Sequence, residues 1–297
     1  QDGTAGYLPT FVTGDPEMVL ANTRVLVEAR RKSAVCEKNI LGVHLEGPFI
    51  NPKCTGAQNP AYVRKPDIEE VKRLNAVFPV KKITFAVEEE GGAELVGELL
   101  SMGITPSCTH SAAKYPEFMA AYNNGLRNLS HFCNQMSPQH HREIGLVGSG
   151  MLDKDIKIEI ICDKIHLCED MLKLTFTNKS IDQMIMITDS LACSWMPDGP
   201  GQLGGLPIIV KGGVARLESG NLAGSTLWMN QGLKNLRDVT GLELKDLVRV
   251  TSWNQAIELG LGDELGKVEK GYTADLVVLN PRTWKTSAVF VDGEQRI

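Results

Sequence analysis

The chain has 297 residues, 42% hydrophobic and 23% charged, and is long enough for a full α/β barrel or for two smaller domains. Its net charge of -5, with no long run of either sign, argues against nucleic acid or an anionic membrane surface as the main partner. No apolar stretch could span a bilayer, the N-terminus has no signal pattern, and the seven cysteines form no C-x-x-C pair, so we expect a cytoplasmic protein with reduced thiols.

Short apolar runs alternate with amphipathic stretches up to residue 189. An apolar run bounded by Gly or polar residues predicts a buried strand, and apolar residues three or four positions apart predict a helix. The expected strands cover residues 7–12, 39–45, 82–87, 104–109, 126–132, 156–162 and 184–188. The expected helices cover residues 17–29, 68–78, 93–102, 116–123 and 170–176. This alternation predicts an α/β fold with a parallel sheet of seven barrel strands.

The pattern changes after Asp189. A hairpin is expected over residues 208–214 and the region around Leu217, with Gly212 and Gly213 at the turn. Further helices are expected at residues 226–236, 244–251 and 253–259, and strands in the tail at residues 265–279 and 287–291. We therefore divide the chain into a barrel catalytic domain and a small β unit, with bounds 1–264 and 265–297.

Glu46 lies where an apolar run stops and the turn-forming pair Gly47-Pro48 begins. Because this turn ends a buried strand, Glu46 is expected at the carboxyl end of that strand. That end of the sheet is where α/β barrels build their active sites. A single Glu in such a place is more often a loop cap or the partner of a surface Lys.

Two other predicted strands end in histidine, at His110 and His131. A lone His at a strand end is more often a hydrogen-bonded structural residue. However, one carboxylate and two imidazoles at three strand ends match a catalytic divalent-metal site, which keeps a coordination position open for water. We therefore predict that Glu46, His110 and His131 bind one metal ion that acidifies its bound water and polarises a substrate carbonyl.

Groups that could transfer protons follow two more strands. Asp189 comes after a very apolar run, and beside the metal it would take a proton from water and pass it to a leaving nitrogen. Its alternative roles are a helix cap or a hydrogen-bond partner of a ligand histidine. His166 follows the strand expected at 156–162, and it either contacts substrate or is an ordinary loop residue.

A set of short segments that carry these residues occurs in one order along the chain, at residues 44–49, 56–58, 109–111, 130–136, 141–148, 187–189 and 222–225. In sequence and in order they resemble the metal-binding Glu loop, the two His motifs, the phosphate-contacting segment, the catalytic Asp strand and the sugar-covering loop of the N-acetylglucosamine-6-phosphate deacetylases. These enzymes belong to the amidohydrolase superfamily. The resemblance runs from about Tyr7 to the C-terminus.

The resemblance implies a TIM-like (β/α)8 metal-dependent hydrolase barrel, followed at residues 265–297 by the C-terminal strands of a small β-sandwich domain. It implies hydrolysis of the acetamido group of N-acetylglucosamine 6-phosphate to glucosamine 6-phosphate and acetate. Glu46, His110 and His131 would hold one divalent ion, Zn²⁺ or alternatively Fe²⁺, and Asp189 would be the catalytic base and then acid. The residues that the resemblance assigns to the phosphosugar are Ala57, Gln58, Asn134, Gln135, Arg142, His166, Leu222, Ala223 and Gly224.

Arg142 has the charge and the planar fork that suit a phosphate group. In the family this Arg can come from the neighbouring subunit, so the resemblance implies a homodimer. Without the resemblance, Arg142 would be an ordinary solvated charge.

The chain departs from the family at several positions. Gln58 stands where some members have His, and an amide can donate a hydrogen bond but cannot carry a proton. Cys133 and Gln135 replace the more usual Tyr and Ala, and Lys164 stands where Gly is common. The family's first barrel strand and the first half of its sandwich are not visible before Tyr7, so we expect a barrel without its first strand.

Two alternative functions stay open from the sequence. One is deacetylation of a related substrate such as N-acetylgalactosamine 6-phosphate, which would keep the fold and the metal chemistry. The other is a truncated, inactive homologue that only binds a sugar phosphate. The retained ligand set argues against this second alternative, and the absent first strand argues for it.

Overall fold

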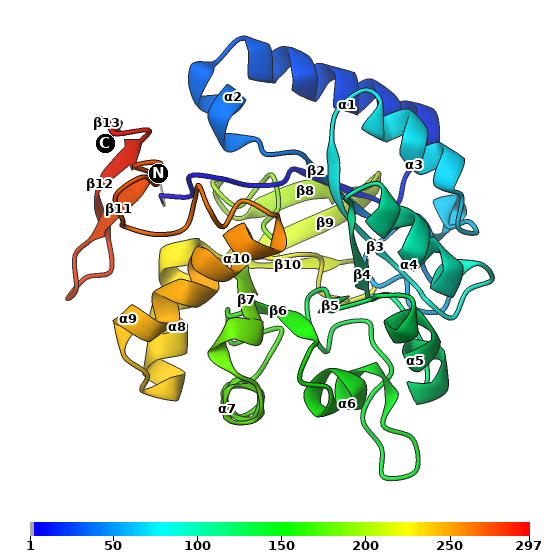
Figure 1. Cartoon of the computed structure of the whole chain (residues 1–297). Helices are drawn as coiled ribbons and strands as arrows, with labels where there is room; N and C mark the ends of the chain where they lie inside the picture. Colours follow the sequence, from blue (N-terminus) through cyan, green and yellow to red (C-terminus); the bar gives the residue numbers. More distant parts are fainter. Residues whose placement is uncertain (1–2) are drawn as a thin grey trace.

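The computed structural model describes residues 3–297 (Figure 1). At its centre is one sheet of parallel strands, hydrogen-bonded in the order in which they occur along the chain. The strands are β1 (Thr10–Val12), β2 (Val43–Glu46), β3 (Val80–Phe85), β4 (Thr105–Cys108), β5 (Asn128–Leu129), β6 (Lys157–Ile161) and β7 (Met184–Ile187). The predicted parallel sheet of seven barrel strands is therefore confirmed.

Helices connect successive strands and surround the sheet (Figure 1). Those between β1 and β7 are α1 (Pro16–Arg31), α2 (Ala34–Asn39), η1 (Pro60–Tyr62), α3 (Ile68–Asn75), α4 (Gly92–Ser101), α5 (Tyr115–Asn123), α6 (Gly145–Leu152), α7 (Glu169–Asn178) and η2 (Ile181–Gln183). Those after the barrel strands are α8 (Met229–Thr240), α9 (Leu244–Leu247), η3 (Val248–Thr251) and α10 (Trp253–Glu258). Among the described residues, no helix has both the length and the hydropathy needed to cross a bilayer.

The main hydrophobic core lies between the sheet and these helices. Helix α4 illustrates how it forms, because Leu95 and Val96 lie four and three residues before Leu99, on one face of the helix, and all three are fully buried. Helix α1 starts where the sequence indicates, since the Asp15 side chain accepts hydrogen bonds from the backbone N–H groups of Glu17 and Met18.

The concave side of the sheet contains a buried charge network. Lys82 on β3 donates to Glu159 on β6 and, at 2.9 Å, to Glu258 on α10. All three side chains are at most 10% exposed. Burial opposes the charge on Lys82, but the two carboxylates outweigh burial and raise its pKa. Helix α10 therefore contributes to the interior of the barrel, although it follows the sheet by more than sixty residues.

The sheet is open on one side within the described residues, since β1 pairs with β2 and β7 with β6, but β1 and β7 do not pair with each other. A second, antiparallel sheet contains β8 (Gly199–Leu203), β9 (Leu206–Lys211) and β10 (Val214–Leu217). The hairpin of β9 and β10 was predicted, and β8 was not. At the turn between β8 and β9, a Cβ on Gly204 would lie 2.9 Å from Val12 Cγ2, so this turn packs against the end of β1.

The C-terminal residues form a third sheet of β11 (Leu276–Leu279), β12 (Thr286–Val291) and β13 (Glu294–Gln295). The prediction of strand over residues 265–275 is wrong, because this stretch is made of turns and irregular backbone. Gly3 lies against Val277, and Lys38 pairs with Asp292, so the start of the chain and α2 contact this sheet (Figure 1). The proposed domain boundary at residue 265 stays a prediction.

Two other expectations are corrected. The predicted strand 39–45 is shorter, because residues 34–39 form α2, which the Ser33 hydroxyl caps by accepting from the Cys36 N–H. The predicted strand 126–132 is reduced to β5, because His131 has a φ of 28° and has left the extended conformation. Helix α6 was not predicted at all.

Candidate active site

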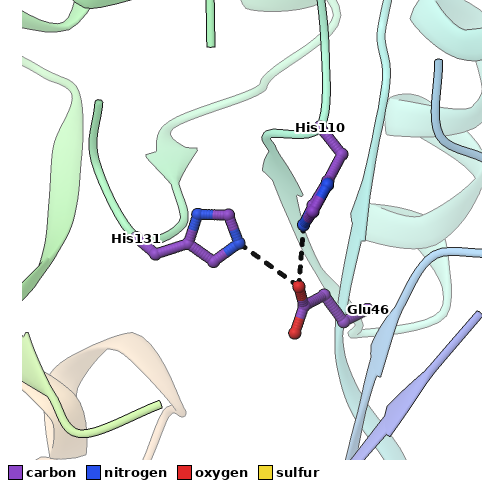
Figure 2. Close-up of side chains that lie close together, drawn as sticks. All are labelled: Glu46, His110 and His131. Carbon is purple, nitrogen blue, oxygen red and sulfur yellow. Dashed lines mark hydrogen bonds and ion pairs between the residues drawn. The ribbon is translucent and has the colours of Figure 1, made fainter. Parts of the chain in front are cut away.

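Glu46, His110 and His131 converge at the carboxyl ends of β2, β4 and β5 (Figure 2). The Glu46 Oε1 atom lies 2.9 Å from His110 Nε2 and 3.3 Å from His131 Nε2. The two imidazole rings are perpendicular, with centroids 5.0 Å apart. Each of the three side chains is at most 10% exposed. The three residues chosen from the sequence therefore form one buried group, which is the only such potential metal-binding group among the described residues.

Three polar residues that follow β4, β5 and β7 have a left-handed backbone, which is uncommon for residues other than glycine. His110 has a φ of 51°, His131 of 28° and Asp189 of 52°. A left-handed residue directly after a parallel strand turns the chain, so that the side chain is directed over the end of the sheet. Such conformations are costly and persist where the surrounding structure holds them, which is typical of functional sites.

The hydrogen bonds around His110 test whether this group suits a metal ion. His110 Nδ1 lies 2.7 Å from the backbone oxygen of Cys54, which can only accept, so Nδ1 carries a proton. The Nε2 atom then faces the Glu46 carboxylate at 2.9 Å, where a metal cation can take the place of a shared proton. One carboxylate oxygen and two imidazole nitrogens are suitable ligands for Zn²⁺ or Fe²⁺. The residues present therefore fit a divalent cation.

The charges of this group are strongly coupled in the metal-free protein. Burial opposes ionisation of Glu46, but hydrogen bonds from His110 and His131 hold its pKa well below the usual range. Burial also opposes protonation of His131, but Glu46 outweighs it and raises the pKa of His131 to about 9. The pair therefore stabilises the metal-free fold fully between the ordinary pKa of a glutamate, about 4.3, and that of a histidine, about 6.5. This contribution is lost as pH rises through about 9, where His131 loses its proton, and as pH falls through the lowered pKa of Glu46.

The raised pKa of His131 predicts that the metal ion binds more tightly as pH rises. At pH 7 the metal-free His131 is protonated, and a ligand imidazole must be neutral, so binding releases about one proton. Between pH 7 and pH 9 we expect the Kd to fall about tenfold per pH unit and then to level off. Zn²⁺ titrations against a chelator of known protonation state measure this, and a Kd that is constant over the range would contradict the prediction.

Gln58 lies directly beside Glu46 and His110 and is 3% exposed. Its Oε1 accepts from the Thr13 N–H at 2.9 Å, so its NH₂ group is turned toward Glu46 Oε1 at 2.9 Å and His110 Nε2 at 3.1 Å. Gly47 has a φ of 88°, and a Cβ there would lie 2.1 Å from Thr13 Oγ1, so only glycine lets Thr13 approach. The structure thus fixes a hydrogen-bond donor at this position, and its role toward a substrate stays a prediction.

Asp189 follows β7 and interacts electrostatically with Glu46, His131 and His166. Burial, followed by the negative charge of Glu46, raises its pKa, which favours a carboxyl group that takes up a proton readily. Its backbone is tied to the predicted sugar-covering loop, because Ser225 N donates to Asp189 O at 2.8 Å. A Cβ on Gly224 would lie 3.0 Å from the same oxygen, so this approach requires glycine.

A cavity of about 420 Å³ lies between the segment after β6, the strand β10 and the N-terminal part of α8. His166, Leu222 and Gly224, which the sequence motifs assign to the substrate, all line it. Asp163 holds the His166 ring in place by a contact of 2.7 Å between its Oδ2 and His166 Nδ1. Burial opposes ionisation of Asp163, but the hydrogen bond and charge of His166 outweigh burial and lower its pKa. Asp189, Glu46, His110 and His131 do not line this cavity, but His166, which does, interacts electrostatically with Asp189.

Other residues assigned to the substrate lie elsewhere. Arg142 is exposed, has its guanidinium 2.7 Å from His141 Nε2, and does not line this cavity. The Asn134 amide donates to the His131 backbone oxygen at 3.1 Å, so it braces the turn that carries this ligand. Gln135 is exposed and packs over Gly56.

Two further assigned residues are buried near the cavity wall. Ala57 and Ala223 belong to the same small apolar cluster beneath the sugar-covering loop, together with residues of β9 and β10. They are placed to shape this wall, but they do not line the cavity.

Several residues of the cavity wall were not assigned to the substrate from the sequence. Trp228 lines the cavity and stacks on Trp195 with ring centroids 4.3 Å apart. Gln231 and Asn235, one helical turn apart on α8, complete that side. Lys164 adds a positive charge and pairs with Glu169 at 2.9 Å. Of these wall residues, only Lys164 had been noted in the sequence, because it stands where the family commonly has Gly.

The parallel barrel sheet carries a buried carboxylate and two imidazoles at its carboxyl end. This arrangement is typical of the amidohydrolase class of barrel enzymes, which hydrolyse amide bonds and are metal-dependent.

The comparisons agree with this class. Residues 17–296 match the amidohydrolase family. The chain is 36% identical over 285 residues to the N-acetylglucosamine-6-phosphate deacetylase of Bacillus subtilis, covering 94% of this chain and 72% of that protein. The chain belongs to the amidohydrolase family and, within it, to the N-acetylglucosamine-6-phosphate deacetylases, as the motifs indicated.

Two further proteins are similar to the chain over most of its length. The crystal structure of the N-acetylglucosamine-6-phosphate deacetylase of Thermotoga maritima superposes with a TM-score of 0.92 at 38% identity, covering 99% of this chain and 79% of that one. The N-acetylgalactosamine-6-phosphate deacetylase of Escherichia coli O157:H7 is 31% identical over 282 residues, covering 94% of this chain and 74% of that protein. The sequence described here thus spans about three quarters of the length of these relatives.

Proposed function

We propose that the protein hydrolyses the acetamido group of N-acetylglucosamine 6-phosphate to give glucosamine 6-phosphate and acetate. The observation that supports this most directly is the convergence of Glu46, His110 and His131 at the carboxyl ends of three strands, near enough to Asp189 to interact with its charge. A cavity large enough for a monosaccharide is lined by His166, Leu222 and Gly224. The kinship with the Bacillus subtilis enzyme suggests the particular substrate.

The cation and the protein side chains contribute different parts of the catalysis. When bound, a divalent cation supplies Lewis acidity, which makes a water molecule acidic near neutral pH and polarises the acetyl carbonyl. The Asp189 carboxylate takes the proton from the attacking water and then delivers it to the departing nitrogen, so that glucosamine 6-phosphate leaves as an amine. The Gln58 NH₂ group is aimed at the same region, where a donor stabilises negative charge that develops on oxygen.

The cavity supports a sugar that lies between His166 and the loop of Leu222, Ala223 and Gly224. We further propose Zn²⁺ as the physiological ion and a homodimer in which Arg142 reaches the cavity of the partner. The exposure of Arg142, and its absence from the cavity wall of its own chain, support this last assignment. A cytoplasmic location stays a prediction.

The test is a screen of acetylated sugar phosphates for released acetate, with the protein loaded with Zn²⁺. We expect the highest kcat/KM for N-acetylglucosamine 6-phosphate and a loss of at least tenfold when its phosphate is removed, since a charged hydrogen bond is then lost. A preference for N-acetylgalactosamine 6-phosphate, which the relative in Escherichia coli O157:H7 makes the main alternative, would replace the proposed substrate. Metal-loaded protein that releases no acetate from any of these compounds would indicate an inactive homologue.

A further inference from the structure

We infer that Glu88 is a positioning residue for the metal site, which holds together the two segments of chain that orient His110. This inference rests on the proposed role of His110 as a ligand. Glu88 lies three residues beyond the end of β3 and was not singled out by any feature of the sequence. It does not belong to the ligand group, and it reaches the site only through other residues.

The Glu88 carboxylate binds both segments at once. Its Oε1 atom accepts from the side-chain amide of Asn51 at 2.9 Å and from the backbone N–H of Ala112 at 2.5 Å. Its Oε2 atom accepts from the Ser111 hydroxyl at 2.5 Å. Asn51 belongs to the loop after β2, and Ser111 and Ala112 directly follow His110. One carboxylate therefore connects the loop of the first ligand strand to the turn of the second.

Both segments act directly on His110. The Asn51 N–H donates to the His110 backbone oxygen at 2.9 Å, and the Asn51 backbone oxygen accepts from the Cys54 N–H at 2.9 Å. The Cys54 oxygen in turn accepts from His110 Nδ1 at 2.7 Å. These hydrogen bonds form a closed set. It runs from Glu88 to Asn51, Cys54 and the His110 imidazole, and it returns to Glu88 through Ser111, which follows His110.

This closed set of hydrogen bonds determines the two properties that a ligand histidine needs, which are the orientation of its imidazole and the position of its proton. The contact with Cys54 fixes the ring orientation and keeps the proton on Nδ1, so that Nε2 is available to a cation. The contacts with Ser111 and Ala112 hold the backbone that follows the left-handed His110, whose φ of 51° is costly without outside support. Hydrogen bonds to an ionised carboxylate are the stronger kind, which suits this task.

Glu88 is not the only support of this turn, so its loss should affect the site more than the fold. The Ser111 N–H also donates to the Gln135 oxygen at 3.0 Å, and the Ser137 N–H donates to the Ser111 oxygen at 3.2 Å. Removal of a group that orients a ligand commonly weakens metal binding about 10- to 100-fold.

The experiment measures the Kd for Zn²⁺ in metal-free wild type, Glu88→Ala and Glu88→Gln, by competition with a chelator and without substrate. We expect a Kd about 10- to 100-fold higher in Glu88→Ala. We expect a smaller rise, about threefold to tenfold, in Glu88→Gln, which keeps the shape and one acceptor. The visible spectrum of the Co²⁺ form should change in both variants, because the His110 imidazole is no longer held in one orientation.

The matched control is Glu89→Gln, which removes the adjacent carboxylate. Within the described residues, Glu89 makes no side-chain hydrogen bond to either segment, although it shares the local electrostatic field, as its raised pKa from burial and from Glu88 shows. Its Kd should stay within about threefold of wild type, because the orienting contacts are intact. Thermal unfolding of the metal-free proteins shows whether each variant is folded. If Glu88→Ala does not fold, the Kd of the isosteric Glu88→Gln decides the question.

A folded Glu88→Ala or Glu88→Gln protein with the wild-type Kd and Co²⁺ spectrum would overturn the inference. So would a Glu89→Gln protein that loses as much affinity as Glu88→Gln, since the effect would then be one of local charge. Because no substrate is present, these results do not depend on which acetylated sugar the enzyme hydrolyses, or on whether it hydrolyses any.

Discussion

Replacing Glu46 with Gln is expected to weaken Zn²⁺ binding by more than about 100-fold, and turnover should fall with it. The Glu46 Oε1 atom lies within 3.3 Å of both ligand imidazoles, so this carboxylate supplies the only negative charge inside the group. An amide of the same shape leaves two buried imidazoles facing a divalent cation without any countercharge. The interactions left in such a site do not offset the free energy that the cation loses when its hydration shell is removed.

The metal content of the purified variant and its Kd for Zn²⁺ measure this effect. Glu70→Gln is a suitable control, because Glu70 is also a buried carboxylate, but it pairs with Arg64 and does not belong to the ligand group. We expect the control to keep a full complement of metal. Wild-type metal content in Glu46→Gln would show that the ligand assignment is wrong.

The second large effect is expected from Asp189→Asn, which should retain most of the bound metal but lower kcat about 10²- to 10⁴-fold. The carboxyl group lies beside the ligands and close to His166, yet it does not belong to the ligand group. An amide has nearly the same size and accepts hydrogen bonds, but it cannot take a proton from water. Asn is the substitution of choice because it tolerates the left-handed backbone at this position, where φ is 52°.

Metal content and steady-state kinetics on the same samples separate this prediction from the first. We expect KM to change less than kcat, because the proton is transferred only during the reaction. Loss of metal from Asp189→Asn would make Asp189 a ligand rather than a base. A variant that keeps at least a tenth of wild-type kcat would remove it from the proton-transfer step.

The sequence was sufficient for the ligand group because each of its members ends a parallel strand. The carboxyl ends of parallel strands meet at one edge of the sheet, so Glu46, His110 and His131 had to approach one another once the strands were recognised. The same reasoning located Asp189. Helix α2 was missed, although Ser33 is a visible N-cap, since no element was predicted over residues 34–38 and Asn39 was placed in the following strand.

The remainder of the site depends on long loops, whose paths do not follow from periodicity. Glu88 and Asn51 come together through turns that no pattern of apolar residues describes. Arg142 carries a recognisable motif, but its exposed position in this chain could not be deduced from charge alone. The contribution of Trp228 to the cavity arises from the packing of α8 beside the second sheet, which is a tertiary property.

The buried network of Lys82, Glu159 and Glu258 has a consequence for how the polypeptide acquires its fold. The positive charge on β3 is neutralised in part by α10, close to the end of the chain. A nascent chain that lacks α10 would leave an ammonium group short of one partner, and breaking a buried ion pair costs about 3–5 kcal/mol. The catalytic scaffold therefore reaches full stability only with α10 in place, so β3, β6 and this distant helix depend on one another for their stability.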